Sequence, residues 1–215
     1  MRVSDTKQKP LHSSTQEAGP LMLQAFAWDM MPDASHWRYL AQHAQSIADL
    51  GVTIIWLPPA YKGNYGLNDV GYGVYDLYDL GEFDQKGTIP TKYGMKDEYL
   101  AAIDALHEAG IAVCADIVLN HRMGADATEM VRATPINQQD RHQVIGEPEM
   151  IEAWTRFTFP GRGGAYSDFT WDWTCFHGID RDQATKRNGL WLFEGKHWNE
   201  SVDTEFGNFD YLMGC

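Results

Sequence analysis

The sequence predicts an α/β fold in which a short parallel sheet is followed by a β-rich module. Twice in the first part of the chain, an apolar strand is followed by an amphipathic helix, a glycine and another apolar strand. This order is typical of βαβ units, whose strands lie parallel in one sheet. Beyond residue 121 the pattern stops, and residues 122–215 are instead rich in Trp, Phe, Gly and Asp. Two different kinds of structure are therefore expected in one chain.

Each element of the first part has its own signal. The three parallel strands are expected at the apolar runs Leu21–Trp28, Val52–Leu57 and Ile111–Leu119. Helices are expected where apolar residues recur at helical spacing, from Ser35 as N-cap to Gly51 and from Lys96 to Ala109. Residues 1–20 are polar and predict a loose tail. The expected domains are thus 1–20, 21–121 and 122–215.

Composition and charge limit the classes of function. Thirty acidic residues against 17 Lys and Arg give a net charge of −13, which repels phosphate backbones and argues against nucleic acid as a partner. The three cysteines have no framework spacing, so no disulfide scaffold is expected, and Cys114 is expected to be a small core residue. The polar N-terminus lacks the apolar segment of a signal peptide, and no apolar run reaches the ~18 residues of a membrane span. We therefore expect a cytoplasmic protein without a membrane partner.

Six segments carry a pattern that is more specific than composition. They are Trp56–Lys62, Asp69–Phe83, Gln85–Thr88, Thr91–Gly94, Asp116–His121 and Asn208–Met213. In this order the segments resemble the α-amylase family of glycoside hydrolases, in its bacterial cytoplasmic or liquefying form. The resemblance implies the N-terminal part of a (β/α)8 TIM barrel, strands 1–3, with a β-rich inserted domain B after strand 3. It also implies retaining endo-hydrolysis of α-1,4 bonds in glucans derived from starch or glycogen, which are then the expected partners.

No catalytic residue is assigned. In the family, the nucleophile, the acid and a third carboxylate lie on strands four, five and seven, and retaining hydrolysis needs two carboxyl groups ~5–5.5 Å apart. The fourth-strand motif, Arg-x-Asp shortly before Lys-His, does not occur in this sequence, and Arg181–Asp182 is expected in a polar loop. Asp203 and Glu205 have no context that supports a catalytic role. The chain is expected to be inactive alone, as the N-terminal portion of an α-amylase; the alternative is a non-catalytic glucan- or partner-binding remnant.

Trp28, Tyr72 and His121 are the candidates for substrate binding. Tyr72 lies between two glycines, which would leave its ring free to stack on a sugar, although a loop aromatic also fills core gaps. Trp28, at the end of the first expected strand, is open to the same two interpretations. His121 taken alone could simply organise a loop, whereas the resemblance implies a donor to a sugar hydroxyl.

Roles are also expected for Asp116 and for a series of aromatic residues. The resemblance implies that Asp116 is a barrel-internal acid that pairs with an arginine of the fourth strand. An aromatic series that alternates in places is expected to form the core of the inserted module rather than a sugar platform: Trp154, Phe157, Phe159, Tyr166, Phe169, Trp171, Trp173 and Phe176.

The resemblance also implies a calcium site between the barrel and the inserted domain. Its ligands would be Asn120, Asp180, Asn199 and Asp210, whose hard oxygen atoms suit Ca²⁺. Asx residues in loops more often cap turns, so this alternative stays open. Asn199 stands where variants with several metals have an aspartate, which argues against a second or third cation. The sequence does not determine the oligomeric state.

Overall fold

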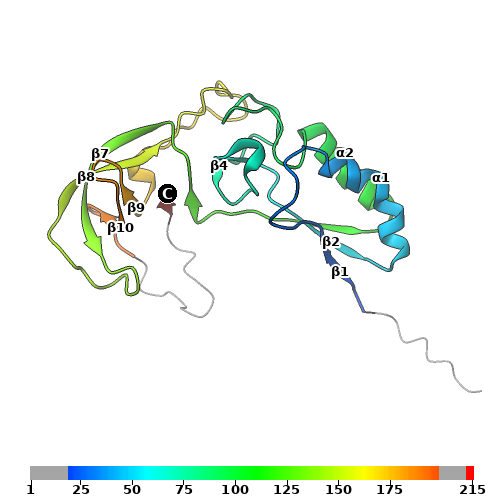
Figure 1. The fold of residues 1–215 in the computed structure, drawn as a ribbon, viewed down its shortest axis with the longest axis horizontal. Helices are drawn as coiled ribbons and strands as arrows, with labels where there is room; N and C mark the ends of the chain where they lie inside the picture. The colour runs from blue at the N-terminus through cyan, green and yellow to red at the C-terminus, as the bar shows by residue number, and fades with distance from the viewer. Residues whose placement is uncertain (1–18, 199–211) are drawn as a thin grey trace, which may run out of the picture.

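The computed structural model describes residues 19–198 and 212–215. Figure 1 shows an elongated arrangement with a helix-and-sheet unit at one end and a β-rich module at the other. The loops around two short strands, β3 (Lys62–Gly63) and β4 (Val74–Asp76), lie between them. Asn199 and Asp210 fall outside the described residues, as do Asp203 and Glu205.

The first unit contains a three-stranded parallel sheet of order β1-β2-β5. Its strands are β1 (Met22–Gln24), β2 (Ile54–Leu57) and β5 (Ala112–Ala115). These strands lie within the three expected apolar runs but are shorter. The third ends at Ala115 instead of Leu119, because beyond Asp116, whose N–H still bonds to Leu57, the backbone turns towards other partners.

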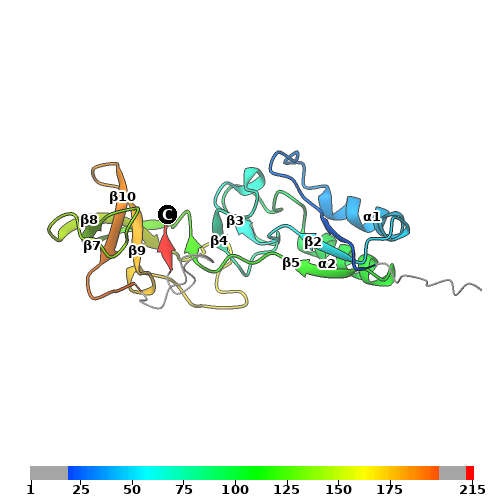
Figure 2. The same cartoon turned by 90° about the horizontal axis from the view of Figure 1, so that it is seen from below.

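Helices α1 (His36–Asp49) and α2 (Lys96–Glu108) pack together on one face of this sheet. Figure 2 shows both helices beside the sheet. The core between the layers includes Trp37, Leu40, Ile55, Leu57 and Leu106. Ser35 directly precedes α1 as expected, but its hydroxyl donates to Asp33 (2.7 Å) and does not cap the helix.

The opposite face of the parallel sheet is open in the part of the chain that the structure describes. Met22 of β1 is 52% exposed. Cys114 is also exposed, so the expectation that it is a core residue is wrong. Successive side chains of a strand point to opposite faces, and Cys114 lies on a strand whose second face has no described covering layer.

The β-rich module is a six-stranded sheet of order β6-β11-β9-β10-β7-β8, mostly antiparallel. Two 3₁₀ turns, Gly66–Asn68 and Trp173–Cys175, complete the described elements, and no helix among them is long and apolar enough to cross a membrane. The strands of the module are β6 (His121–Arg122), β7 (Ala127–Ile136), β8 (Glu149–Arg156), β9 (Gly178–Asp182), β10 (Arg187–Phe193) and β11 (Met213–Gly214).

Two sequence expectations about the module need correction. Arg181 and Asp182 lie in strand β9 and not in a loop, because both pair with β10 across an antiparallel ladder. In the aromatic series, Phe157 and Phe176 are fully buried, but Tyr166 and Phe169 are 60% and 56% exposed. Only part of the series therefore forms the core.

Candidate functional site

The loop that carries Tyr72 is fixed by Asp69. The buried Asp69 carboxylate accepts the N–H groups of Gly71 (2.8 Å) and Gly73 (3.1 Å), which flank Tyr72. A Cβ atom at Gly73 would lie 2.3 Å from this carboxylate, and one at Gly63 would lie 2.1 Å from it. Glycine is therefore required at both positions for the carboxylate to reach the backbone. Asp69 was not among the residues predicted for the site, although the glycines around it were a usable signal.

The Tyr72 side chain is fixed by a hydrogen bond from its hydroxyl and by a second aromatic ring beside its own. Its hydroxyl donates to Asp116 (2.7 Å), and its ring lies almost parallel to that of Trp28, at 7° with centroids 6.1 Å apart. Loss of hydration and the Asp116 carboxylate raise the pKa of Tyr72, so the phenol stays protonated. Trp28 is 72% exposed and forms the open side of this pair. In this structure, the partner of Asp116 is the tyrosine hydroxyl and not an arginine.

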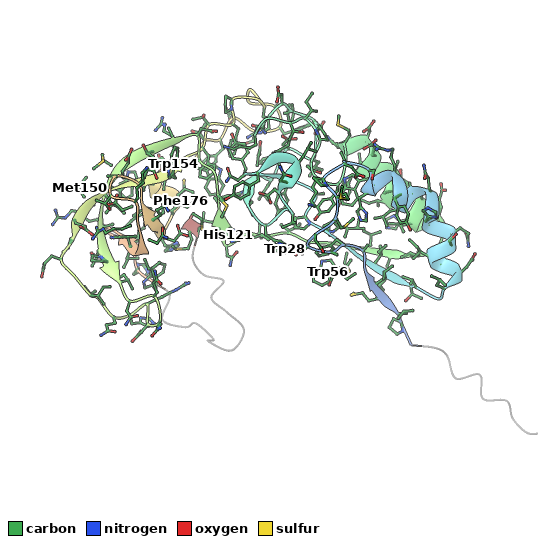
Figure 3. The ribbon with its side chains drawn as sticks, in the orientation of Figure 1. Trp28, Trp56, His121, Met150, Trp154 and Phe176 are labelled. Carbon is green, nitrogen blue, oxygen red and sulfur yellow. The ribbon has the colours of Figure 1, made fainter. Side chains whose placement is uncertain are left out.

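His121 joins this loop to the β-rich module. One ring nitrogen, Nε2, lies 2.7 Å from the carbonyl oxygen of Tyr72, to which it donates, and Nδ1 lies 3.1 Å from the side-chain oxygen of Asn120. His121 thus organises the loop. Figure 3 shows Trp28 and His121 in the middle of the molecule, between the parallel sheet and the module. All three candidate substrate residues therefore belong to one connected group.

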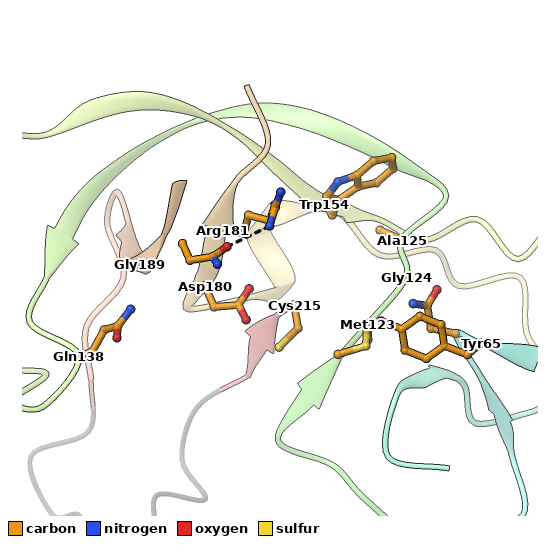
Figure 4. A pocket seen from close by; sticks show the side chains of 12 residues that line it. Tyr65, Met123, Gly124, Ala125, Gln138, Trp154, Asp180, Arg181, Gly189 and Cys215 are labelled. Atoms are coloured by element: carbon orange, nitrogen blue, oxygen red, sulfur yellow. Dashed lines mark hydrogen bonds between the residues drawn. The ribbon is translucent and has the colours of Figure 1, made fainter. Parts of the chain in front are cut away.

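Of the four candidate metal ligands, two are described. Strand β11 pairs with both β6 and β9, which brings the segment of Asn120 close to Asp180. Asp180 lines a cavity of about 610 Å³ together with Arg181 and Cys215 (Figure 4). Among the described residues, no group of three or more His, Cys, Asp or Glu could hold a metal ion.

The electrostatics of Asp180 are compatible with a cation. The Asp180 side chain is exposed to the cavity, but the surrounding protein removes part of its hydration. This loss of hydration raises the pKa of Asp180 and outweighs the positive charges of Arg181 and His121, which lower it. Burial and the nearby Asp180 also raise the pKa of Cys215 to about 12. Asp180 accepts no hydrogen bond from another described side chain, so its oxygen atoms remain available. Asn120 and Asp180 both carry hard oxygen atoms, the kind of ligand that Ca²⁺ takes.

Comparison with known proteins decides the family. A family model for the α-amylase catalytic domain matches residues 29–173, more than half of the chain. This chain belongs to the α-amylase family. An α-amylase of Geobacillus stearothermophilus is 52% identical over 89% of this chain and 35% of its own length. The cytoplasmic α-amylase of Escherichia coli strain K12 is 51% identical over 91% of this chain and 40% of its own.

The chain therefore spans between one third and two fifths of the length of these α-amylases. Among solved structures, an alternansucrase in complex with isomaltononaose is similar, with a TM-score of 0.56 and 28% identity. That match covers 65% of this chain and 12% of the alternansucrase chain. Family membership, glycosidase relatives and a carbohydrate-bound structural neighbour agree with one another.

Proposed function

We propose that this chain forms the glucan-contacting part of an α-amylase that hydrolyses internal α-1,4 bonds with retention. The observation that carries the proposal is the pair of Trp28 and Tyr72, with Trp28 exposed and Tyr72 fixed through Asp116, Asp69 and His121. An exposed, rigid aromatic pair offers a flat apolar surface to the CH-rich face of a sugar ring. The pair lies just beyond the carboxyl end of β1, the end at which TIM-barrel enzymes carry their sites.

The open sheet face supports a barrel as the parent fold. In a (β/α)8 barrel, helices ring the outside and the other face of each strand lines the filled interior. Helices α1 and α2 cover one face of β1, β2 and β5, and the exposed face matches the interior of a barrel. In this arrangement, β1, β2 and β5 are strands 1–3, and the six-stranded module is the domain inserted after strand 3.

Within this proposal, the 215 residues bind glucan but do not cleave it. Both carboxyl roles must be filled for the bond to break, and the fourth-strand motif that carries the family nucleophile does not occur in the sequence. His121 would donate to a sugar hydroxyl after exchanging its bond to the Tyr72 carbonyl. The similarity to the Escherichia coli cytoplasmic α-amylase supports a cytoplasmic location.

Calcium is the cofactor proposed for the corner between β6 and β9. Asn120 and Asp180 would hold it from the described part of the chain, with Asn199 and Asp210 as the further ligands. When bound, the ion supplies positive charge that ties the module to the loop after the parallel sheet. The available carboxylate of Asp180 and its raised pKa support this assignment.

The proposal is tested by titrating the 215-residue chain with maltoheptaose while recording tryptophan fluorescence. We expect binding in the millimolar range, about tenfold weaker in Trp28→Ala and in Tyr72→Ala, since tenfold corresponds to ~1.4 kcal/mol and an aromatic contact supplies about that much. Tyr39→Ala removes a tyrosine of α1 that is 56% exposed and is the matched control. Equal affinity in Trp28→Ala and the parent chain would show that the aromatic pair is not the contact.

A second measurement separates the enzyme from the non-catalytic alternative. Reducing ends released from maltoheptaose by the 215-residue chain should not exceed those released by His121→Ala. The same assay on the chain combined with barrel strands four to eight of a related α-amylase should show turnover. If that assembly folds and binds maltoheptaose without cleaving it, the glucan-binding alternative holds and the hydrolase proposal fails.

A further inference from the structure

Arg122 is a buried cation that forms no direct salt bridge with a described residue. It is 7% exposed, and its side chain forms no hydrogen bond and no salt bridge with any residue of 19–198 or 212–215. A buried charge without a partner is costly, and arginine cannot escape the cost by losing its proton. Two other buried cations are satisfied: Lys62 donates to carbonyl oxygens of Thr88 (2.6 Å) and Ile89 (2.7 Å), and Arg162 donates to Asp76 (2.8 Å). Arg122 differs from these two in having a buried guanidinium nitrogen without an acceptor.

The Arg122 guanidinium lies beside a cavity of about 240 Å³, which we call the arginine cavity. Trp171 covers one face of the guanidinium, with 4.5 Å from the guanidinium carbon to the ring centroid. Hydrogen bonds of a guanidinium lie in its plane, so this stacking leaves the N–H groups without a partner and does not replace one. The Nη1 atom is buried and unpaired.

The one carboxylate that lines the arginine cavity is already used. Asp76 is 1% exposed, and its Oδ2 atom accepts from Arg162 Nε (2.8 Å) and from Gln85 (2.9 Å), while its Oδ1 atom accepts the N–H of Tyr78 (3.1 Å). Arg162 thus neutralises Asp76, and the charge of Arg122 is left over. The cavity walls carry a net charge of about +1, although the whole chain is strongly acidic. Salt largely screens the exposed acidic residues elsewhere on the chain, so the charge of the cavity walls is the main electrostatic influence on a ligand inside the cavity.

We propose that the arginine cavity binds a phosphoryl group, held in the plane of the Arg122 guanidinium. Arginine forms two parallel hydrogen bonds to a phosphoryl group, which a point charge such as lysine cannot match. The hydroxyl groups of Tyr78 and Ser167, also on the lining, supply neutral donors for further oxygen atoms. A tetrahedral group has enough acceptors for all of them. This site is independent of glucan hydrolysis and of the calcium proposal.

The ligand is either inorganic phosphate or a phosphate ester on a sugar. The charge of the cavity walls does not distinguish inorganic phosphate from a sugar phosphate. Phe169, which also lines the arginine cavity, is 56% exposed and lies edge-on to Trp171, with ring centroids 5.6 Å apart. A sugar attached to the phosphoryl group would reach this exposed ring. Inorganic phosphate would not use it.

The experiment uses the 215-residue chain in a phosphate-free buffer at constant ionic strength. Thermal melts and calorimetric titrations are recorded with inorganic phosphate, glucose 6-phosphate, glucose and acetate. Arg122→Met removes the charge at similar length, and Arg122→Lys keeps the charge without the planar fork. The matched control is Arg132→Met, which removes an arginine with a half-exposed side chain, paired with the exposed Glu194.

Inorganic phosphate should raise the melting midpoint of the parent chain and of Arg132→Met, because a ligand that binds only the folded state stabilises it. Affinity should fall at least tenfold in Arg122→Met and by a smaller factor in Arg122→Lys. Without phosphate, Arg122→Met should melt at or above the parent midpoint, since it removes an unpaired buried charge. Tighter binding of glucose 6-phosphate that is lost in Phe169→Ala identifies a sugar phosphate as the ligand; equal binding identifies inorganic phosphate.

Three results would overturn the proposal. One is a lower midpoint of Arg122→Met in phosphate-free buffer, which would mean that Arg122 already has a partner within the protein. Another is an unchanged phosphate affinity in Arg122→Met or, if that variant does not fold, in Arg122→Lys. The third is an equal effect of acetate and phosphate, which would make the cavity a site for any anion.

Discussion

The parallel sheet and the β-rich module differ in how their apolar faces are covered. In the module, Phe157, Phe176 and Ile151 are fully buried between the curved sheet and its own loops. In the parallel sheet, α1 and α2 bury one face, but Leu21, Met22 and Leu23 of the first strand region are 38–52% exposed. The module's own loops and Tyr75 of β4 close the core of the module, whereas the parallel sheet depends on a second layer. The candidate site lies where the two meet, with Tyr72 and Asp116 on the side of the parallel sheet and His121 on that of the module.

The largest expected effect comes from truncating a side chain in the closed core. Phe176→Ala should lower the free energy of unfolding by about 3–5 kcal/mol, because it opens a cavity in a packed region. Met22→Ala, on the open face of the sheet, should change it by less than about 0.5 kcal/mol. Urea unfolding of both variants checks the contrast. Similar losses would mean that the open sheet is covered in solution.

Self-association is the second expected consequence of the open sheet. Exposed apolar strands template pairing with another chain, so the 215-residue chain should form dimers or larger species in sizing experiments. Met22→Lys should weaken this association by about tenfold or more, since fully burying a methionine contributes ~1.5–3 kcal/mol. The control is Met150→Lys on β8 of the module, a residue that is 54% exposed. A monomer peak for the parent chain at all concentrations would contradict the prediction.

A smaller effect is expected where the two regions are joined. Tyr72→Phe removes the hydroxyl that donates to Asp116 and should lower the free energy of unfolding by about 1 kcal/mol. Tyr39→Phe, on the exposed side of α1, should have no measurable effect. Chemical denaturation of the two variants gives the comparison. A loss in Tyr39→Phe as large as that in Tyr72→Phe would remove the case for the hydroxyl bond.

The smallest effect concerns the pH dependence at Asp180. Its pKa is raised in the folded state, so the folded protein favours the protonated form, and the destabilisation develops as pH rises through the folded pKa. Without metal, Asp180→Asn should therefore melt slightly above the parent at pH 7, and the difference should vanish below the ordinary aspartate pKa. Added Ca²⁺ should raise the midpoint of the parent and not that of the variant. Equal responses to Ca²⁺ would exclude Asp180 as a ligand.

The sequence by itself determined the order of strands and helices in the parallel unit and the family. Local signals predicted these elements correctly: the helical spacing around Trp37 and Leu40, and the glycines at positions 51 and 110 that follow the helices. The segments around Tyr72 and His121 identified the family because short motifs keep their residues wherever they lie in space. The glycines at positions 71 and 73 showed that this loop is unusual, though not that Asp69 is the reason.

Only the tertiary structure decided which side chains meet. The hydroxyl of Tyr72 bonds to Asp116, 44 residues away, and Arg162 neutralises Asp76, 86 residues away. Such pairs depend on how the loops fold back between the two sheets. Neither the periodicity of the sequence nor local propensity predicts the conformation of these loops. Burial was equally undetermined: Cys114 lies in an apolar run but is exposed, and Arg122 is charged but buried. The physical reason is that burial depends on which layer covers a face, and a strand's own sequence does not specify its neighbours.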